Sequence, residues 1–346
     1  MGLPSMLQAG YGLLASIMVW AIPFRERRKE SPLLQLPVEL ICRISNELSP
    51  TSRLILSQTC RPLREILRKD VSLVRFTRQD RCEFLAAIAR HLPDRWVCEA
   101  CIGLHGVLTV DTPETPCSIT CLAGRERWRY TGYGQRDRLD ARLLRIDHRH
   151  VQLALKYTRL QCYRYHQYLN KLIAPHINPS FETHPWPYKQ PNKLAVRYSA
   201  YPKIVMGNDG NLRFLVLSTW CYQEAGSPLS LPAMGDLKIC PHLKLTYGLG
   251  KGVGHDFGSL RGILRPYLLH GGRHRTKGYY YCCYCPTDLR ITKSPGRIEL
   301  HAWQDLGPEG SPMDKAWRVH IRLVTARGLP YLSHEPGSIW ELYQTG

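Results

Sequence analysis

The residues best suited to chemistry in this chain are cysteines in two Cys-x-x-Cys pairs. The first pair is Cys98 and Cys101, and the second is Cys282 and Cys285. A Cys-x-x-Cys turn can present two thiolates to one tetrahedral zinc ion, and two such turns complete a four-cysteine site. The pairs lie far apart in the sequence, so only the folded chain can bring them together. We therefore predict one structural zinc site, with these four cysteines as its ligands.

Other candidate donors lie near the pairs: His105, Cys117 and Cys121 after the first, and Cys240 and His242 before the second. The alternative is that the cysteines are reduced thiols in strands, because the successive residues Cys282 and Cys283 would point to opposite faces of a strand. A catalytic zinc is not expected, since no His-Glu-x-x-His motif and no deaminase-type motif is present.

Other enzyme motifs are also missing from the sequence. The glycine-rich run 248–254 lacks the Gly-Lys-Ser/Thr order of a phosphate-binding loop, and no Gly-x-Ser-x-Gly elbow occurs. The pattern favours a non-catalytic protein.

The cysteine pairs must be positioned by a region that reads as rich in strands. Short β-branched or aromatic runs are separated by Gly, Pro, Asp and Ser, and they lie at 141–160, 212–223, 278–291, 297–307 and 316–326. Antiparallel hairpins are expected. Before this region, Thr77 with Asp80 predicts a capped helix that ends near Pro93.

Three short helices are predicted within residues 34–67. Their starts are marked by Pro37, by Ser49 with Pro50, and by Pro62. So small a unit buries only part of its apolar surface, so we expect it to dock on a partner.

At these residues the chain resembles the F-box family. The matching positions are Leu36-Pro37, Glu39-Leu40, Ile44, Leu48, Leu56-Ser57, Thr59-Cys60-Arg61 and Leu63-Arg64. The resemblance implies binding to the small adaptor that joins F-box proteins to a cullin–RING ubiquitin ligase. The residues that the resemblance implies face the adaptor are Leu36, Pro37, Leu40, Ile41, Ile44, Leu48, Leu56 and Cys60.

The rest of the chain resembles uncharacterised F-box proteins of filamentous fungi. The residues that match are Cys98, Cys101, Leu104, His105, Cys282, Tyr284, Cys285, Trp303, Asp305, Leu306 and Gly307. This resemblance implies a Cys/His-containing C-terminal domain and no known substrate.

Composition indicates a globular protein, with 44% hydrophobic and 22% charged residues. The net charge of +19 is compatible with nucleic-acid or acidic-surface binding. The densest basic stretch, 125–171, is interleaved with aromatics, and we interpret it as the solvated face of a sheet. The odd number of cysteines, 13, favours a reduced protein of the cytosol or nucleus.

The first 30 residues combine an uncharged apolar segment, 2–24, with the basic run 25–29. This segment is a candidate membrane anchor that would leave the following residues in the cytosol. The alternative is a helix packed on the domain or a loose tail.

Together these features predict an α+β protein. Residues 31–75 form a three-helix F-box, a linking helix follows, and 76–346 form a β-rich domain with antiparallel hairpins that recognises a client protein. The expected function is substrate recognition for a cullin–RING ligase. The alternative is a zinc-stabilised protein that binds nucleic acid or an acidic surface and has no ligase role.

Overall fold

The structure is a computed structural model. It describes residues 31–73, 76–117, 121, 143–183, 193–224, 228–245, 260–269, 277–321 and 331–346. The chain divides into two compact units, Met1–Val74 and Arg75–Gly346, which we describe separately.

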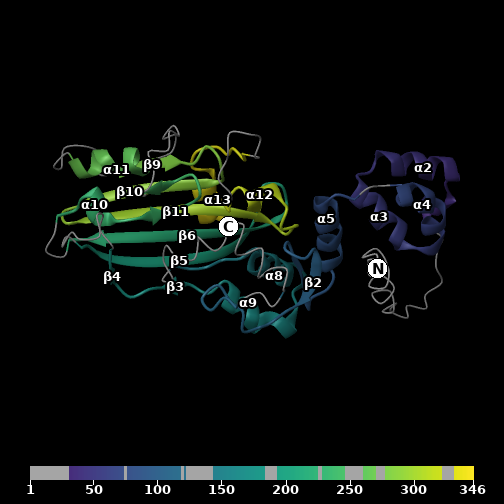
Figure 1. The fold of residues 1–346 in the computed structure, drawn as a ribbon, viewed down its shortest axis with the longest axis horizontal. Coiled ribbons are helices and arrows are strands. Elements are labelled where there is room, and N and C mark those ends of the chain that lie inside the picture. The colour runs from purple at the N-terminus through teal and green to yellow at the C-terminus, as the bar shows by residue number, and fades with distance from the viewer. Residues whose placement is uncertain are drawn as a thin grey trace, which may run out of the picture. The chain divides into compact units, whose positions relative to one another are not determined.

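The N-terminal unit is helical. Its elements are η1 (Pro32–Gln35), α2 (Val38–Glu47), α3 (Pro50–Thr59) and α4 (Arg61–Leu73) (Figure 1). Helices α2, α3 and α4 begin within one residue of the starts predicted from Pro37, Pro50 and Pro62. At the start of α3 the Ser49 side chain accepts a hydrogen bond from the Ser52 backbone N–H at 3.2 Å, and Pro50 occupies the first turn, where no N–H is needed.

Ile41, Leu63 and Leu67 are the buried residues at the centre of this unit. Partly buried side chains pack around them, from Leu33, Leu34, Leu56, Cys60 and Ile66. A core of this size leaves much apolar surface in contact with solvent.

The second unit begins with α5 (Arg78–Ala89), which starts at the predicted cap. The Thr77 hydroxyl accepts from the Asp80 N–H, and the Asp80 carboxylate accepts from the Thr77 N–H at 2.8 Å, which completes a capping box. A hairpin of β1 (Arg95–Cys98) and β2 (Gly103–Gly106) follows. Helix and hairpin share a small satellite core of Ala86, Ala89 and Val97.

The larger part of this unit is an antiparallel sheet of seven strands, in the order β3-β5-β6-β11-β10-β9 with β4 also paired to β5 (Figure 1). The strands are β3 (His176–Ile177), β4 (Phe181–Glu182), β5 (Ala195–Met206), β6 (Leu212–Gln223), β9 (Lys277–Tyr281), β10 (Thr287–Ser294) and β11 (Arg297–Pro308). The predicted α+β class, with helices followed by a β-rich region of antiparallel hairpins, is confirmed.

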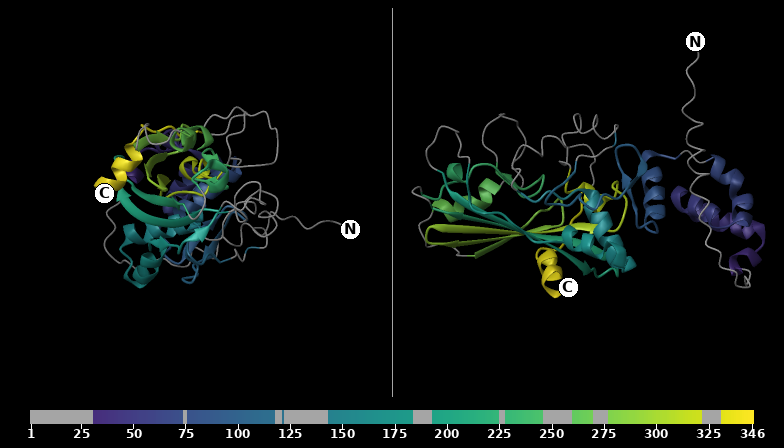
Figure 2. Two further views of the ribbon diagram at one scale, coloured as in Figure 1. Left: turned by 90° about the vertical axis from the view of Figure 1, so that its left-hand side faces the viewer. Right: turned by 90° about the horizontal axis from the view of Figure 1, so that it is seen from below.

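One face of the sheet carries the main core. Short elements pack on this face: α8 (His148–Leu160), η2 (Tyr163–Tyr165), α9 (His166–Leu172), α10 (Leu231–Met234), β7 (Leu237–Lys238), β8 (Lys244–Leu245) and α11 (Leu260–Leu269). The C-terminal helix α13 (Ser338–Thr345) lies on the opposite face from α11 (Figure 2).

Two predicted strands are wrong where they are described. The run 141–160 contains α8, and residues 316–321 of the run 316–326 form most of α12 (Lys315–Arg318) and a turn. Helix α8 is buried on every side, including the polar residues Arg149, Gln152 and Lys156. Arg149, Gln152, Lys156 and Arg159 follow the i, i+3, i+7, i+10 spacing of one helical face, so the sequence does carry a helical period, and the strand prediction overlooked it. The basic stretch 125–171, where it is described, is mostly helical. It is buried over residues 149–157 and mostly exposed over 161–171, and it is not the face of a sheet.

The candidate membrane anchor, residues 2–24, and the glycine-rich run 248–254 lie outside the described residues. Within the described part of the chain, no helix is long and apolar enough to cross a bilayer.

Candidate metal centres and the helical docking face

Four metal-binding side chains meet at the β1–β2 hairpin. They are Cys98, Cys101, His105 and Cys121, which we call cluster A, and their donor atoms all lie within 4.8 Å of one another. Cys101 Sγ and His105 Nε2 are 3.1 Å apart. Cys98 is buried, whereas Cys101 is exposed to solvent.

The turn between β1 and β2, which contains Cys101, has an unusual backbone at the residue after Cys101. Ile102 has a φ of +53°, a left-handed value that is strained for a β-branched residue. Its N–H donates to the Cys98 carbonyl at 3.0 Å, so the turn closes tightly and holds both thiols on one side. Backbone strain of this kind is found at ligand-binding sites more often than elsewhere.

The surroundings hold this turn in place. The His105 ring stacks on Trp96 with centroids 5.0 Å apart. The guanidinium of Arg78, at the start of α5, donates to the Glu99 carbonyl and to the Ala100 carbonyl, the latter at 3.2 Å. The hairpin turn is thereby fastened to the first turn of α5.

A buried ion pair holds the segment that ends at Cys117. The Asp111 carboxylate accepts from Arg149 Nε at 2.5 Å and from the Cys117 N–H at 2.7 Å. The Arg149 side chain is only 4% exposed, so it needs this partner to offset its desolvation. The pair connects residues 111–117 to α8.

Without a cation, the Cys98 and Cys101 thiols of cluster A favour the protonated form. Burial raises the pKa of Cys101 to about 12 and also raises that of Cys98, and burial lowers the pKa of His105. A divalent cation reverses the preference of the thiols, because it binds the thiolate, and it binds the neutral imidazole that burial of His105 already favours.

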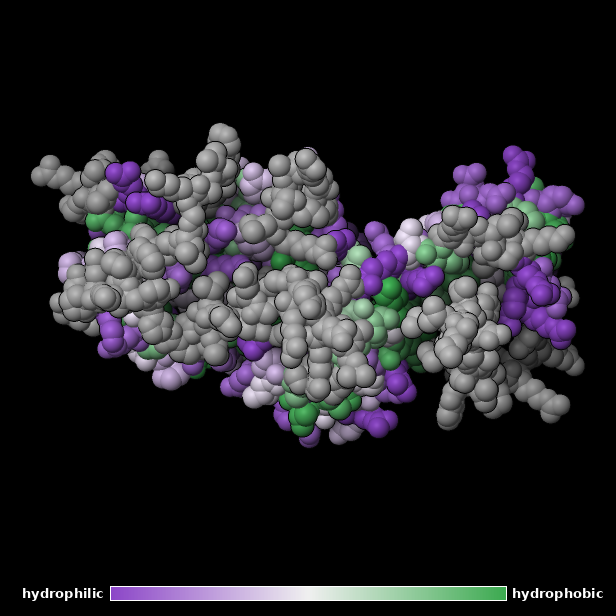
Figure 3. All heavy atoms as spheres, in the orientation of Figure 1, coloured by the Kyte–Doolittle hydropathy of each residue, from purple (hydrophilic) through white to green (hydrophobic). Residues whose placement is uncertain are grey.

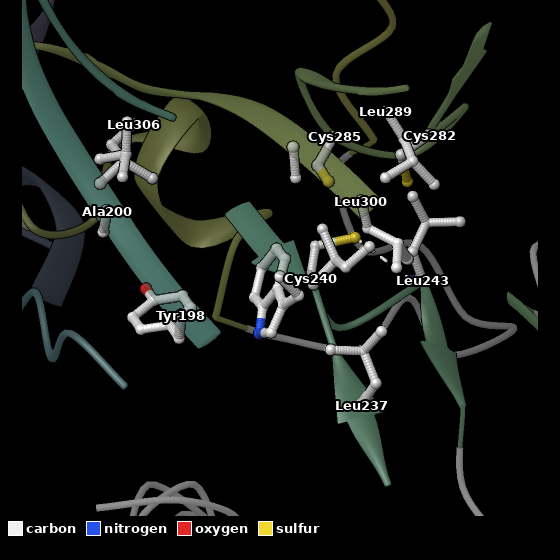
Figure 4. Close-up of a cluster of buried hydrophobic side chains, with 14 of the residues drawn as sticks. Tyr198, Ala200, Leu237, Cys240, Leu243, Cys282, Cys285, Leu289, Leu300 and Leu306 are labelled. Carbon is white, nitrogen blue, oxygen red and sulfur yellow. Dashed lines mark hydrogen bonds between the residues drawn. The ribbon is translucent and has the colours of Figure 1, made fainter. Parts of the chain in front are cut away.

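A second cluster, which we call cluster B, lies in the main core. Its members are Cys240, His242, Cys282 and Cys285, and their donor atoms also lie within 4.8 Å of one another. The three cysteines are at most 2% exposed. In Figure 4 their sulfur atoms lie close together among the side chains of Leu243, Leu289 and Leu300.

Cluster B is assembled from two separate turns. Cys240 and His242 lie between β7 and β8, and Cys282 and Cys285 lie in the turn between β9 and β10. The Leu243 N–H donates to Cys240 Sγ at 3.2 Å, and Cys285 Sγ lies 3.3 Å from Thr287 Oγ1. Burial raises the pKa of the Cys240 thiol, whereas hydrogen bonds with Cys240 and Cys285 lower the pKa of Cys282. Ionising all three thiols at this depth requires a compensating cation.

The predicted single site with Cys98, Cys101, Cys282 and Cys285 does not form. The two pairs belong to different clusters, each completed by donors nearer in the sequence. His105 and Cys121 complete the first, and Cys240 and His242 complete the second. These four residues are near the Cys-x-x-Cys pairs in the sequence, but the sequence alone did not assign them as ligands of either site.

The N-terminal unit presents apolar side chains to solvent. Leu36 is 36% exposed, and Leu40 and Ile44 on α2 are both 42% exposed. Leu40 and Ile44 are four residues apart, so they share one face of the helix. Apolar residues reach the surface of this unit beside charged ones (Figure 3).

This unit also matches a known protein-family model, described as the F-box domain, over residues 33–75. Residues 33–75 are an F-box domain. No curated protein and no solved structure shows significant similarity to the chain.

In the F-box the residues predicted to face the adaptor differ in exposure. Leu36, Pro37, Leu40 and Ile44 are exposed, and Leu48, Leu56 and Cys60 are half-buried. Ile41 is 1% exposed and packs against Leu63 and Leu67. It is therefore a core residue and is not available as an anchor, because its neighbours already cover it.

Proposed function

We propose that this protein is the substrate-recognition subunit of a cullin–RING ubiquitin ligase. The F-box binds the small adaptor of the ligase, and the unit from Arg75 to Gly346 binds a client protein. The protein itself performs no chemistry. It raises the rate of ubiquitin transfer by holding the client near the charged conjugating enzyme.

The observation that carries this proposal is the F-box with its exposed apolar face. Leu36, Leu40 and Ile44 stand in solvent, although burying one such side chain contributes about 1.5–3 kcal/mol. A partner with an apolar groove would recover that free energy, as in other complexes where a helix inserts its apolar face.

Adaptor binding is tested by co-purification of the full chain with the adaptor. We expect the wild type to co-purify and Leu40→Asp with Ile44→Asp to lose binding, because two carboxylates would enter an apolar interface. The matched control is Arg68→Ala, an exposed residue on α4. A wild type that folds and does not bind the adaptor would refute the proposal.

Client recognition is assigned to the second unit because the F-box is engaged by the adaptor. The test compares ubiquitinated proteins in cells that express the wild type or the Leu40→Asp, Ile44→Asp variant. Proteins modified only with the wild type are clients. Identical profiles, with adaptor binding intact for the wild type, would argue against a ligase role. This role also places the protein in the cytosol or nucleus.

We propose structural zinc as the cofactor of the second unit. Clusters A and B each combine three cysteines with one histidine, a donor set typical of structural zinc. Zinc would join the hairpin turns in the way a disulfide joins chains in oxidising compartments.

A further inference from the structure

We infer that the second unit binds two zinc ions of unequal accessibility, a solvent-exchangeable one in cluster A and an inert one in cluster B. This goes beyond the proposal of structural zinc, because it states the number of ions, their ligands and their behaviour. It concerns metal content alone, so it can fail while adaptor binding succeeds, and the reverse.

The number of ions follows from the donors. Each cluster supplies three thiols and one imidazole, which fill a tetrahedral coordination shell without any residue from the other cluster. In such a shell two sulfur ligands are about 3.8 Å apart, given zinc–sulfur bonds of about 2.3 Å. Donor atoms that already lie within 4.8 Å of one another need only small movements to reach this geometry.

The accessibility of the two ions follows from burial. In cluster A the Cys101 side chain is exposed and His105 is half-buried. A chelator can therefore reach the ion at the surface of the hairpin. In cluster B the exposed fractions of Cys240, Cys282 and Cys285 are 2%, 2% and 0%. His242 is half-buried like His105, but its Nε2 atom is buried, and no cysteine of this cluster is exposed. A chelator must wait until the main core opens, and opening of a core approaches the free energy of global unfolding.

The ion of cluster A also has a local structural task. It would link the β1–β2 hairpin, through Cys98 and Cys101, to the segment that carries Cys121. The satellite core has Ala86, Ala89 and Val97 as its buried residues, and α5 also buries Cys82 and Phe84. Because this apolar burial is small beside that of the main core, we expect α5 and the hairpin to depend on the ion more than the seven-stranded sheet does.

Metal analysis of the purified full chain tests the number of ions. We expect two zinc ions per chain, and one in each of Cys101→Ser and Cys282→Ser. The matched controls are Cys117→Ser and Cys283→Ser, whose side chains lie outside the clusters but next to them in sequence. Both controls should keep two ions. Folded wild type with fewer than two ions, or with iron in place of zinc, would overturn the inference.

A zinc-chelating dye added to the folded protein tests the exchange. We expect one equivalent to be released at once and the second only when the protein unfolds. Cys101→Ser should lose the fast phase alone. If Cys282→Ser fails to fold, the Cys101→Ser variant still decides, because it must retain one slowly released ion. Release of both equivalents in a single phase from the wild type would refute the unequal pair.

Hydrogen exchange after the fast phase tests the local task. Amides of α5, β1 and β2 should exchange faster once the first ion is removed, while those of β6 and β11 should be unchanged. If exchange is unchanged throughout, the ion released in the fast phase came from a site that does not stabilise α5 and the hairpin. Its assignment to cluster A would then be wrong.

Discussion

The carboxylate of Asp288 on β10 accepts a hydrogen bond from the backbone N–H of Ile339, in the first turn of α13, at 2.9 Å. The same carboxylate accepts from the N–H groups of Gly337 and Trp340 and lies 3.0 Å from His334 Nε2. A carboxylate at a helix N-terminus satisfies free N–H groups and favours the helix dipole. Asp288 therefore fastens the C-terminal helix to the sheet.

Substituting Asp288→Asn should detach α13. The amide has one acceptor oxygen, and its NH2 group would face backbone donors, so we expect a loss of about 1–3 kcal/mol in the free energy of unfolding. Denaturant unfolding measures it. The control Glu335→Gln, at an exposed position before the helix, should unfold like the wild type. Equal stability of Asp288→Asn and wild type would contradict the fastening role.

The Asp111–Arg149 pair predicts a loss of stability in acid. Burial opposes ionisation of Asp111, but hydrogen bonds and charge from His150 and Arg149 outweigh it and lower its pKa from 3.8 to about 2. Because the folded pKa is depressed, the stabilisation is complete above about pH 4 and is lost as the pH falls through about 2, an effect on the order of 2 kcal/mol. Unfolding between pH 5 and pH 2 should show this slope in the wild type and a shallower one in Asp111→Asn. If the stability of the wild type and of Asp111→Asn falls equally steeply with pH, the stabilising role of the Asp111 carboxylate is refuted.

Ile41 and Leu40, which are adjacent on α2, should respond differently to truncation. Ile41 is 1% exposed and Leu40 is 42% exposed. Ile41→Ala removes buried atoms and should destabilise the F-box by about 2–4 kcal/mol, whereas Leu40→Ala should change stability by less than about 0.5 kcal/mol. Thermal unfolding distinguishes the two. Adaptor binding should fall in both, but only Ile41→Ala should lose it through unfolding, and a stable Ile41→Ala would disprove the core assignment.

Thr77 should contribute to the stability of α5 through its capping box. In Thr77→Ala the Asp80 N–H loses its side-chain acceptor, and we expect a cost of about 1 kcal/mol. Because α5 packs on the satellite core, hydrogen exchange of α5 and β1 should report the change. Thr77→Ser, which keeps the hydroxyl, serves as the control and should behave like the wild type.

Much of the fold could be predicted where interactions are local. The starts of α3 and α5 depend on Ser49 and Thr77 bonding to residues three positions away, and the strands β6 and β11 follow from short β-branched runs. The burial of helix α8 could not be predicted in this way, although its sequence carries a helical period. Its burial on all sides depends on elements distant in the sequence, such as Gly310, whose carbonyl accepts from Gln152 at 3.2 Å.

The candidate sites also differ in whether they depend on local sequence or on contacts between distant segments. The sequence by itself determined the F-box, because its pattern is contained in one short segment. It also determined that Cys98 with Cys101, and Cys282 with Cys285, form two Cys-x-x-Cys motifs. Only the tertiary structure decided that the pairs belong to two clusters and that Ile41 is covered. The distance between donors, and the choice of which face of a helix is buried, depend on chain segments that meet only after folding.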